Sequence, residues 1–113
     1  MHELSIATSI LKTAEREVEN SGGHAVKEIT LSVGKLAGVE IDSLKFIWGA
    51  CMKHTVLEKA EIVLLEPKGK AVCMECGTVF ALEKLYDSCP KCGSYFKEIM
   101  SGKELKINKL IIM

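Results

Sequence analysis

The 113-residue chain has few aromatic side chains, only 2 prolines and no excess of charge of either sign. Phe, Trp and Tyr make up 5% of the residues, and 15 Lys and Arg balance 15 Asp and Glu. Without a basic surplus the chain offers no positive field for a nucleic-acid backbone or an anionic membrane. No apolar run approaches the roughly 20 residues that span a bilayer, and no leader-like segment opens the sequence. We therefore expect a cytoplasmic protein that binds neither nucleic acid nor membranes.

Signatures of catalysis are also absent from the sequence. The pattern GxxxxGK[ST], whose backbone amides cradle nucleotide phosphates, does not occur. No nucleophile with an adjacent base, no pair of carboxylates and no open metal site stands out. We therefore expect a protein that is not an enzyme and does not hydrolyse GTP by itself.

Hydrophobic periodicity predicts two helices. The first is expected to end at Ser21-Gly22-Gly23, because apolar residues recur before it at three- and four-residue steps: Leu4, Ala7, Leu11, Ala14 and Val18. Asp42 is the expected N-cap of the second helix. One face of that helix carries Leu44, Ile47, Trp48 and Cys51, of which Trp48 and Cys51 are expected to be buried.

Three strands are predicted around these helices. Alternation from Ile29 to Val33 indicates a half-buried strand, the run 61–65 a buried strand, and residues 105–112 a closing strand. The fold class expected from this order is α+β, with two helices on a small mixed three-stranded sheet and a zinc-ribbon-like module inserted before the last strand.

Four of the 5 cysteines form two CxxC pairs, Cys73 with Cys76 and Cys89 with Cys92, and a glycine follows each pair. Two thiolates three positions apart can hold one ion from a tight turn. Four thiolates complete a tetrahedral shell without an open position, so the pattern predicts structural Zn(II). The alternative is a thioredoxin-like redox motif, which needs a single pair near a βαβ unit. The apolar residues between the pairs are enough to pack a few side chains on the metal: Val79, Phe80, Leu82, Leu85 and Tyr86.

The chain begins Met1-His2-Glu3. His2 is too bulky for ordinary removal of Met1, so the Met1 amine, the His2 backbone nitrogen and the His2 imidazole can converge on one ion. Such a nitrogen-rich plane suits square-planar Ni(II) or Cu(II). The fourth coordination position is left for a backbone or side-chain group of Glu3 or for an outside ligand. A metal ion whose coordination plane is incomplete is released more easily. The alternative is that His2 is arbitrary and Glu3 is an ordinary first-turn acid.

The remaining histidines are expected to be structural or solvated rather than metal ligands. His24 follows Gly22-Gly23 in a predicted loop, and His54 lies near the predicted end of the second helix. Neither lies between or beside the cysteine pairs, so replacement of a zinc thiolate from within the module is not expected.

Three features together resemble the HypA family of nickel metallochaperones, also called HypA/HybF, which act in [NiFe]-hydrogenase maturation. They are the start Met1-His2-Glu3-Leu4-Ser5, the segment Gly34-Lys35-Leu36-Ala37-Gly38-Val39-Glu40, and the two CxxC pairs. The resemblance implies a nickel-binding α+β domain at 1–69 and 100–113 and a four-cysteine zinc domain at 70–99. It further implies that His2 binds nickel with Glu3 as its motif partner, and that the four cysteines bind zinc.

The resemblance also implies partners. One is a HypB-type GTPase, which would supply the GTP hydrolysis that this chain is not expected to perform. The other is a [NiFe]-hydrogenase large subunit, which would receive the Ni(II). Urease maturation proteins and a domain-swapped dimer stay open. The exposed positions expected on the first helix, Lys12, Glu15, Arg16 and Glu19, are either part of the GTPase docking surface or an ordinary solvated face. A rival function, a free-standing zinc-ribbon adaptor, would explain the cysteines but not Met1-His2-Glu3.

Overall fold

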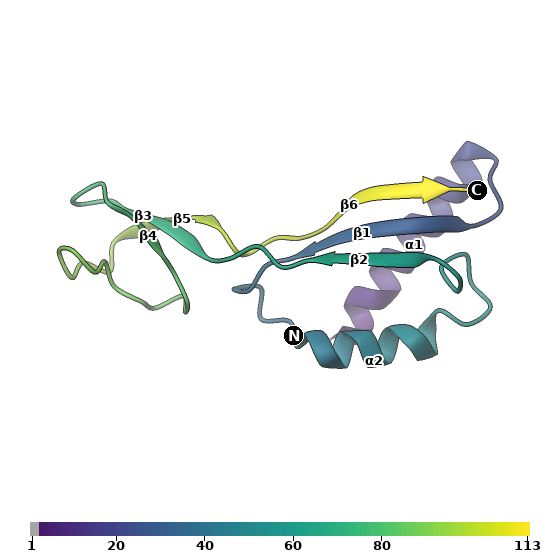
Figure 1. Cartoon of the computed structure of the whole chain (residues 1–113), viewed down its shortest axis with the longest axis horizontal. Helices are drawn as coiled ribbons and strands as arrows, with labels where there is room; N and C mark the ends of the chain where they lie inside the picture. The colour runs from purple at the N-terminus through teal and green to yellow at the C-terminus, as the bar shows by residue number, and fades with distance from the viewer. Residues whose placement is uncertain (1–2) are drawn as a thin grey trace. The chain divides into compact units, whose positions relative to one another are not determined.

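The computed structural model describes residues 3–113, so the predicted nickel donors Met1 and His2 lie outside the described residues. The chain divides into two compact units, whose elements are drawn in Figure 1. The first contains the described residues up to Leu31 together with Val39–Leu64 and Ile107–Met113. The second contains Ser32–Gly38 and Leu65–Lys106.

The helices of the first unit are α1 (Glu3–Ser21) and α2 (Ile41–Cys51), and they pack on each other. Its sheet has the order β2-β1-β6, formed by β1 (Val26–Val33), β2 (Glu61–Leu65) and β6 (Leu105–Ile112). β1 and β2 run in the same direction with α2 between them in the chain, whereas β6 runs the opposite way (Figure 1). The predicted α+β fold, with two helices and a mixed three-stranded sheet, is confirmed.

Most of the predicted apolar face of α1 is confirmed. Ala7, Ala14 and Val18 are buried, and Ile6 joins them, but Leu4 is 55% exposed. Leu4 lies in the first turn of α1, before the first of the buried residues on this helix. In residues 3–113 no helix has both the length and the hydropathy needed to cross a membrane.

The predicted N-cap of α2 is wrong. The cap residue is Glu40, whose own side chain makes no capping hydrogen bond, and Asp42 lies within the first turn. An acid in the first turn still complements the positive end of the helix dipole. Trp48 is buried as expected, at 7% exposure, whereas Cys51 is only half-buried.

The prediction that 61–65 forms a buried strand is correct in its bounds and wrong in its burial. β2 spans Glu61–Leu65, but Ile62 is 41% and Leu65 is 43% exposed. The reason is the strand order, because β2 is an outer strand with β1 on one side only. A run of apolar residues does not distinguish an edge strand from a central one.

The second unit contains a second three-stranded sheet, of order β4-β3-β5, which the hydrophobic pattern did not predict. It is antiparallel, with β3 (Lys70–Cys73) between β4 (Val79–Ala81) and β5 (Lys97–Ser101). In the central register Ala71 faces Phe80 on one side and Ile99 on the other. These strands have 3 to 5 residues, too few for an alternation to show in the sequence.

One buried cluster holds the second unit together, formed by Leu36, Ala71, Cys73, Phe80, Leu82 and Cys89. Phe80 and Leu82 were expected there. Three further residues of the predicted set are exposed: Val79 at 48%, Leu85 at 49% and Tyr86 at 68%. Val79 alternates with Phe80 on β4, so its side chain points to the opposite face of the strand.

Leu36 enters this cluster at a point where three segments of the chain meet. Its amide donates to the Gly102 carbonyl at 2.7 Å, and the Lys35 amide donates to the Pro67 carbonyl at 3.0 Å. A Cβ atom on Gly69 would collide with the Leu82 carbonyl and with the Leu36 side chain, so a glycine is needed for this approach. The segment that contains Leu36 is thereby fixed against the two connecting segments that precede β3 and follow β5.

Candidate metal centre

The structure brings Cys73, Cys76, Cys89 and Cys92 together. Their Sγ atoms all lie within 4.8 Å of one another, with 3.5 Å between Cys73 and Cys92 and 3.7 Å between Cys76 and Cys89. A tetrahedral zinc ion with Zn–S bonds of about 2.3 Å requires S···S edges of about 3.8 Å. The observed spacing fits one tetrahedral ion and exceeds the roughly 2.05 Å of a disulfide bond. The four cysteines could therefore hold a single metal ion.

Each cysteine pair is formed by the same backbone turn. In the first turn the Gly77 amide donates to the Cys73 carbonyl at 2.9 Å, and the Cys73 amide donates to the Thr78 carbonyl at 2.9 Å. The second turn repeats both bonds at 2.8 Å, from Gly93 to Cys89 and from Cys89 to Ser94. Gly77 and Gly93 have φ angles of +74° and +75°, the left-handed conformation that glycine adopts without strain. The CxxCG pattern thus encodes two matching turns.

One cysteine of each pair is buried and the other is exposed. Cys73 and Cys89 belong to the buried cluster with Phe80 and Leu82, while Cys76 and Cys92 face solvent. The two buried cysteines pack in the core of the second unit, and the two exposed cysteines complete the set of four sulfur ligands on the solvent side. An ion bound by all four would therefore join the two turns to the core of the second unit.

The two exposed cysteines have pKa values shifted in opposite directions. Hydrogen bonds from the side chain and backbone of Thr78 lower the pKa of Cys76 to about 6. At Cys92 a backbone hydrogen bond from Ser94 favours the thiolate, but the neighbouring cysteines and desolvation together raise its pKa to about 12. A metal cation would favour the thiolate form of Cys92, because it would replace the proton that this sulfur otherwise keeps.

Glu3 is the one predicted nickel-site residue that the structure describes. It is the first residue of α1 and is half-buried. Its Oε2 accepts a hydrogen bond from the backbone amide of Glu40, the N-cap residue of α2, at 3.2 Å. The starts of the two helices are therefore tied together by the residue that follows His2. The sequence contained both residues in its HypA-like motifs but no signal that they meet.

The other candidate ligands do not join the cysteines. His24 and His54 are exposed, and His54 lies beyond the end of α2 in a turn with φ of +62°. Among residues 3–113, the four cysteines are the one group of three or more His, Cys, Asp or Glu side chains with metal-site spacing. Cys51 is not part of it.

The fold and the cysteine cluster define a small α+β protein with a metal-binding module of its own. Comparison with known proteins identifies its family. A family model described as hydrogenase/urease nickel incorporation, metallochaperone, hypA matches residues 1–112.

Relatives and solved structures agree with this family. Hydrogenase maturation factor HypA of Parabacteroides distasonis is 42% identical over 112 residues, which cover 99% of this chain and 97% of the relative. The factor of the same name from Chlorobaculum tepidum is 41% identical, with 99% of both chains covered. The solution structure of the Ni metallochaperone HypA from Helicobacter pylori matches with a TM-score of 0.71 at 21% identity, covering 100% of this chain and 98% of that one. The last match shows a shared fold.

The chain therefore belongs to the HypA family of nickel metallochaperones for hydrogenase maturation. This confirms the resemblance drawn from its motifs, and it makes the protein a metallochaperone rather than an enzyme.

Proposed function

We propose that this cytoplasmic chain binds Ni(II) at Met1-His2-Glu3 and delivers it to a [NiFe]-hydrogenase large subunit together with a HypB-type GTPase. The nickel donors are the Met1 amine and the backbone and imidazole nitrogens of His2, with a backbone or side-chain group of Glu3 as a further donor. Nickel is the cargo in this proposal, and Zn(II) on the four cysteines is a resident structural ion. The match of the family model over residues 1–112, which include this motif, carries the proposal.

The contact of Glu3 with Glu40 supports a nickel site at the start of α1. The 3.2 Å hydrogen bond occupies one carboxylate oxygen of Glu3, so the residue after His2 has a defined side-chain position. Helix N-termini carry partial positive charge, which disfavours a cation. Glu3, Glu40 and Asp42 supply carboxylates in the two helix starts, and these offset that charge.

A structural role for zinc is supported by the closed donor set. Four thiolates leave no coordination position for water or substrate, and thiolate ligands with tetrahedral spacing favour Zn(II) over the oxygen-seeking cations. Two of the four sulfurs belong to the buried cluster of the second unit, so the ion would stabilise that unit directly. We further assign the proposed nickel domain to 1–69 and 100–113 and the zinc domain to 70–99.

Nickel titration of the zinc-loaded protein tests the proposal. The native chain should bind one Ni(II) tightly, and His2→Ala should abolish this binding while the zinc content stays at one ion per chain. His24→Ala is the matched control, because His24 is exposed and distant in sequence from the motif. Unchanged nickel binding in His2→Ala, or equal loss in His24→Ala, would contradict the proposed site. Absence of nickel binding in the native chain would favour a zinc-ribbon adaptor.

We place the GTPase docking surface on the exposed side of α1. Lys12, Glu15, Arg16 and Glu19 are all exposed on this helix, which starts at the proposed nickel site. Ni(II) can pass between two proteins only if the metal ligands of both proteins can approach the same ion. Reversing the charges of Lys12 and Arg16 should weaken association with a HypB-type GTPase and leave both metals bound. Unchanged affinity for the GTPase would show that the docking surface does not lie on α1. Urease maturation proteins can be tested as alternative partners in the same assay.

A further inference from the structure

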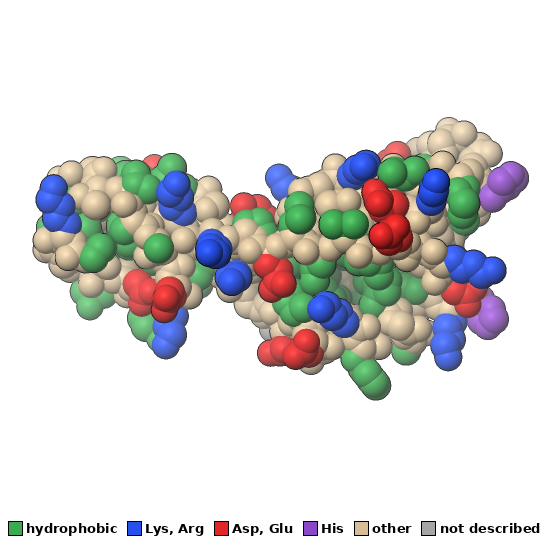
Figure 2. Space-filling model, viewed as in Figure 1, with side chains coloured by type: hydrophobic (Ala, Val, Ile, Leu, Met, Phe, Trp, Pro, Cys, Tyr) green, Lys and Arg blue, Asp and Glu red, His purple; other side chains and the backbone are tan. Residues whose placement is uncertain are grey.

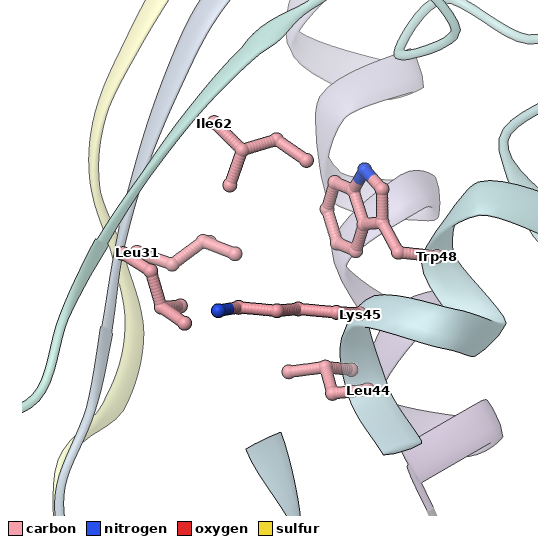
Figure 3. Close-up of a pocket in the computed structure, with 6 residues that line it drawn as sticks. Leu31, Leu44, Lys45, Trp48 and Ile62 are labelled. Carbon is pink, nitrogen blue, oxygen red and sulfur yellow. The ribbon is translucent and has the colours of Figure 1, made fainter. Parts of the chain in front are cut away.

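The cavity of the first unit is lined mainly by hydrocarbon side chains. In Figure 2 hydrophobic side chains line a hollow in this part of the molecule. The cavity has a volume of about 350 Å³, and Leu31, Leu44, Lys45, Trp48 and Ile62 converge on it from α2 and from the strands (Figure 3). Among the described residues its lining includes no thiol, carboxylate or imidazole. The clustered cysteines of the second unit offer more chemistry, because four thiols meet there.

Small solutes can reach two of these four sulfurs. Cys76 and Cys92 are exposed, one in each turn, whereas the first cysteine of each turn is buried. A glycine follows each exposed cysteine. A Cβ atom added to Gly77 or Gly93 would meet no atom within 4 Å outside the adjoining residues, so the space beside each turn is open. A molecule as small as hydrogen peroxide therefore has access to one sulfur of each turn.

Each exposed sulfur lies against a buried sulfur of the other turn. Sγ of Cys92 is 3.5 Å from Sγ of Cys73, and Sγ of Cys76 is 3.7 Å from Sγ of Cys89. Sulfur movements of about 1.5 Å would bring either pair to the length of a disulfide bond. Within the first turn, the Cys73 sulfur accepts a hydrogen bond from the Cys76 backbone amide at 3.5 Å. These contacts favour disulfides between the turns over disulfides within one CxxC pair.

We infer that Cys76 and Cys92 are sites of reversible oxidation by hydrogen peroxide. Each exposed sulfur forms a disulfide with the buried sulfur that it contacts, and the zinc ion is released. The expected disulfides are Cys73–Cys92 and Cys76–Cys89. The inference rests on the proposed zinc site, because zinc keeps the sulfurs as thiolates, the form that peroxide attacks. Disulfide sulfurs carry no negative charge, so the oxidised centre no longer binds Zn(II).

Hydrogen peroxide is the only oxidant that this chemistry needs. The exposed thiolate attacks one peroxide oxygen, the O–O bond breaks, hydroxide leaves and the sulfur becomes a sulfenic acid. The buried thiolate of the other turn then attacks this sulfur, the S–O bond breaks and a second hydroxide leaves. Each disulfide thus takes two electrons from two thiolates and reduces one peroxide to two hydroxides. Two peroxides oxidise all four cysteines and release one Zn(II).

Disulfides between the turns keep the second unit closed after zinc has left. They join residues that are 19 and 13 positions apart, whereas a disulfide within one CxxC pair would leave the two turns unconnected. Cys73 and Cys89 stay in the buried cluster with Leu36 and Phe80. The oxidised unit can therefore bind zinc again once a thiol reductant has opened the disulfides.

Peptide mapping after peroxide treatment tests the pairing. Trypsin cleavage after lysine places the four cysteines on three fragments: 71–84, 85–91 and 92–97. After two equivalents of hydrogen peroxide, the zinc-loaded chain should release its zinc and yield a product in which all three fragments are joined. Fragments 85–91 and 92–97 joined without 71–84 would reveal disulfides within the CxxC pairs and would overturn the inference. So would zinc that stays bound, with free thiols, after the peroxide has been consumed.

A further cut after Glu75 separates Cys73 from Cys76. The Cys73 fragment should then stay joined to 92–97, and the Cys76 fragment to 85–91; the exchanged pairing would contradict the assignment. Cys51→Ala is the matched control, since it changes the cysteine outside the group. This variant should release zinc and form the same disulfides. Loss of the response in Cys51→Ala would assign the oxidation to Cys51 instead.

Hydrogen exchange tests whether the oxidised unit stays folded. Amides of residues 71–80 and of Leu36 should exchange at least about tenfold more slowly in the oxidised zinc-free chain than in the reduced zinc-free chain, because cross-links replace the ion. Equal exchange in the two forms would overturn the closed oxidised unit. Dithiothreitol with Zn(II) should restore one zinc per chain, and failure to do so would contradict reversibility. Failure of the proposed zinc site is recognised separately, because the native chain would then contain no zinc before peroxide is added.

Discussion

The carboxylate of Glu3 accepts a hydrogen bond from the backbone amide of Glu40 at 3.2 Å, across 37 positions of the sequence. Glu3 begins α1 and Glu40 caps α2, so one side chain joins the starts of both helices. Glu40 also closes the stretch that begins at Gly34 and includes the buried Leu36. The residue beside the proposed nickel donors is therefore held by the first residue before α2.

Removing the Glu3 carboxylate should destabilise the first unit slightly. We expect Glu3→Ala to lower the free energy of unfolding by about 0.5–1.5 kcal/mol, the usual net value of one hydrogen bond. Glu3→Gln keeps an acceptor oxygen and should lose less. Urea denaturation of the zinc-loaded protein, followed by Trp48 fluorescence, measures both. Glu15→Ala, an exposed change elsewhere on α1, serves as the control, and an equal loss there would contradict a specific role for the Glu3 contact.

Blocking the N-terminal amine should weaken nickel binding. Even a short extension before Met1 converts the amine into an amide and removes one proposed nitrogen donor. Titration of the extended and native chains with Ni(II) gives the comparison, and zinc content is the internal control. If the extended protein binds nickel as tightly as the native one, the amine is not a ligand and another donor completes the plane.

Loss of a zinc thiolate should unfold the second unit and spare the first. Binding of a structural zinc ion contributes about 10–16 kcal/mol in small zinc modules. We expect Cys73→Ala to abolish hydrogen-exchange protection near 71–94 and around Leu36, which shares the buried cluster with Cys73. Protection around Trp48 should persist. Cys51→Ala changes a cysteine outside the group and should retain one zinc per chain. Collapse of the whole chain in Cys73→Ala would show that the units do not fold separately.

Shortening Leu36 should destabilise the second unit from outside the cysteine module. Leu36 is 8% exposed and packs in the cluster that contains two of the sulfurs. We expect Leu36→Ala to cost about 2–5 kcal/mol, as for other buried leucines, and to accelerate zinc loss to a chelator. Leu85→Ala removes the same atoms from a side chain that is 49% exposed, so it should cost about 0.5 kcal/mol or less. Equal zinc retention in the two variants would contradict the packing role of Leu36.

Thr78 should control how many protons the cysteines release on binding zinc. With a pKa of about 6, Cys76 of the metal-free protein is mostly ionised at pH 7, whereas Cys92, with a pKa of about 12, keeps its proton. Below pH 6 Cys76 is protonated as well, so zinc must displace one more proton and its affinity falls faster with acid. Thr78→Val removes the hydroxyl that lowers the pKa, so proton release at pH 7 should rise. Calorimetry in buffers of different ionisation enthalpy measures this, with Thr8→Val on α1 as control, and unchanged release would contradict the assignment.

Local patterns in the sequence determined most of the secondary structure and the composition of the metal cluster. The CxxCG repeat encodes two turns whose hydrogen bonds span at most five positions, so neighbouring residues suffice to specify them. Helical steps predicted the end of α1 at Ser21, and a short apolar run predicted both bounds of β2. Periodicity reports which residues are apolar on one face, and this depends on the segment alone.

Tertiary structure alone decided which faces became buried and which distant residues met. β2 is half-exposed because the strand order makes it an outer strand, and Val79 is exposed because register turns Phe80 inward. Leu36 lies in a short stretch between Gly34 and Gly38 that has no helical or strand periodicity, so no pattern marked it as part of the cysteine core. Glu3 and Glu40 are each ordinary helix-start acids in the sequence. Their contact exists because the packing of α1 against α2 brings two helix starts together, and long-range packing of this kind has no local signature.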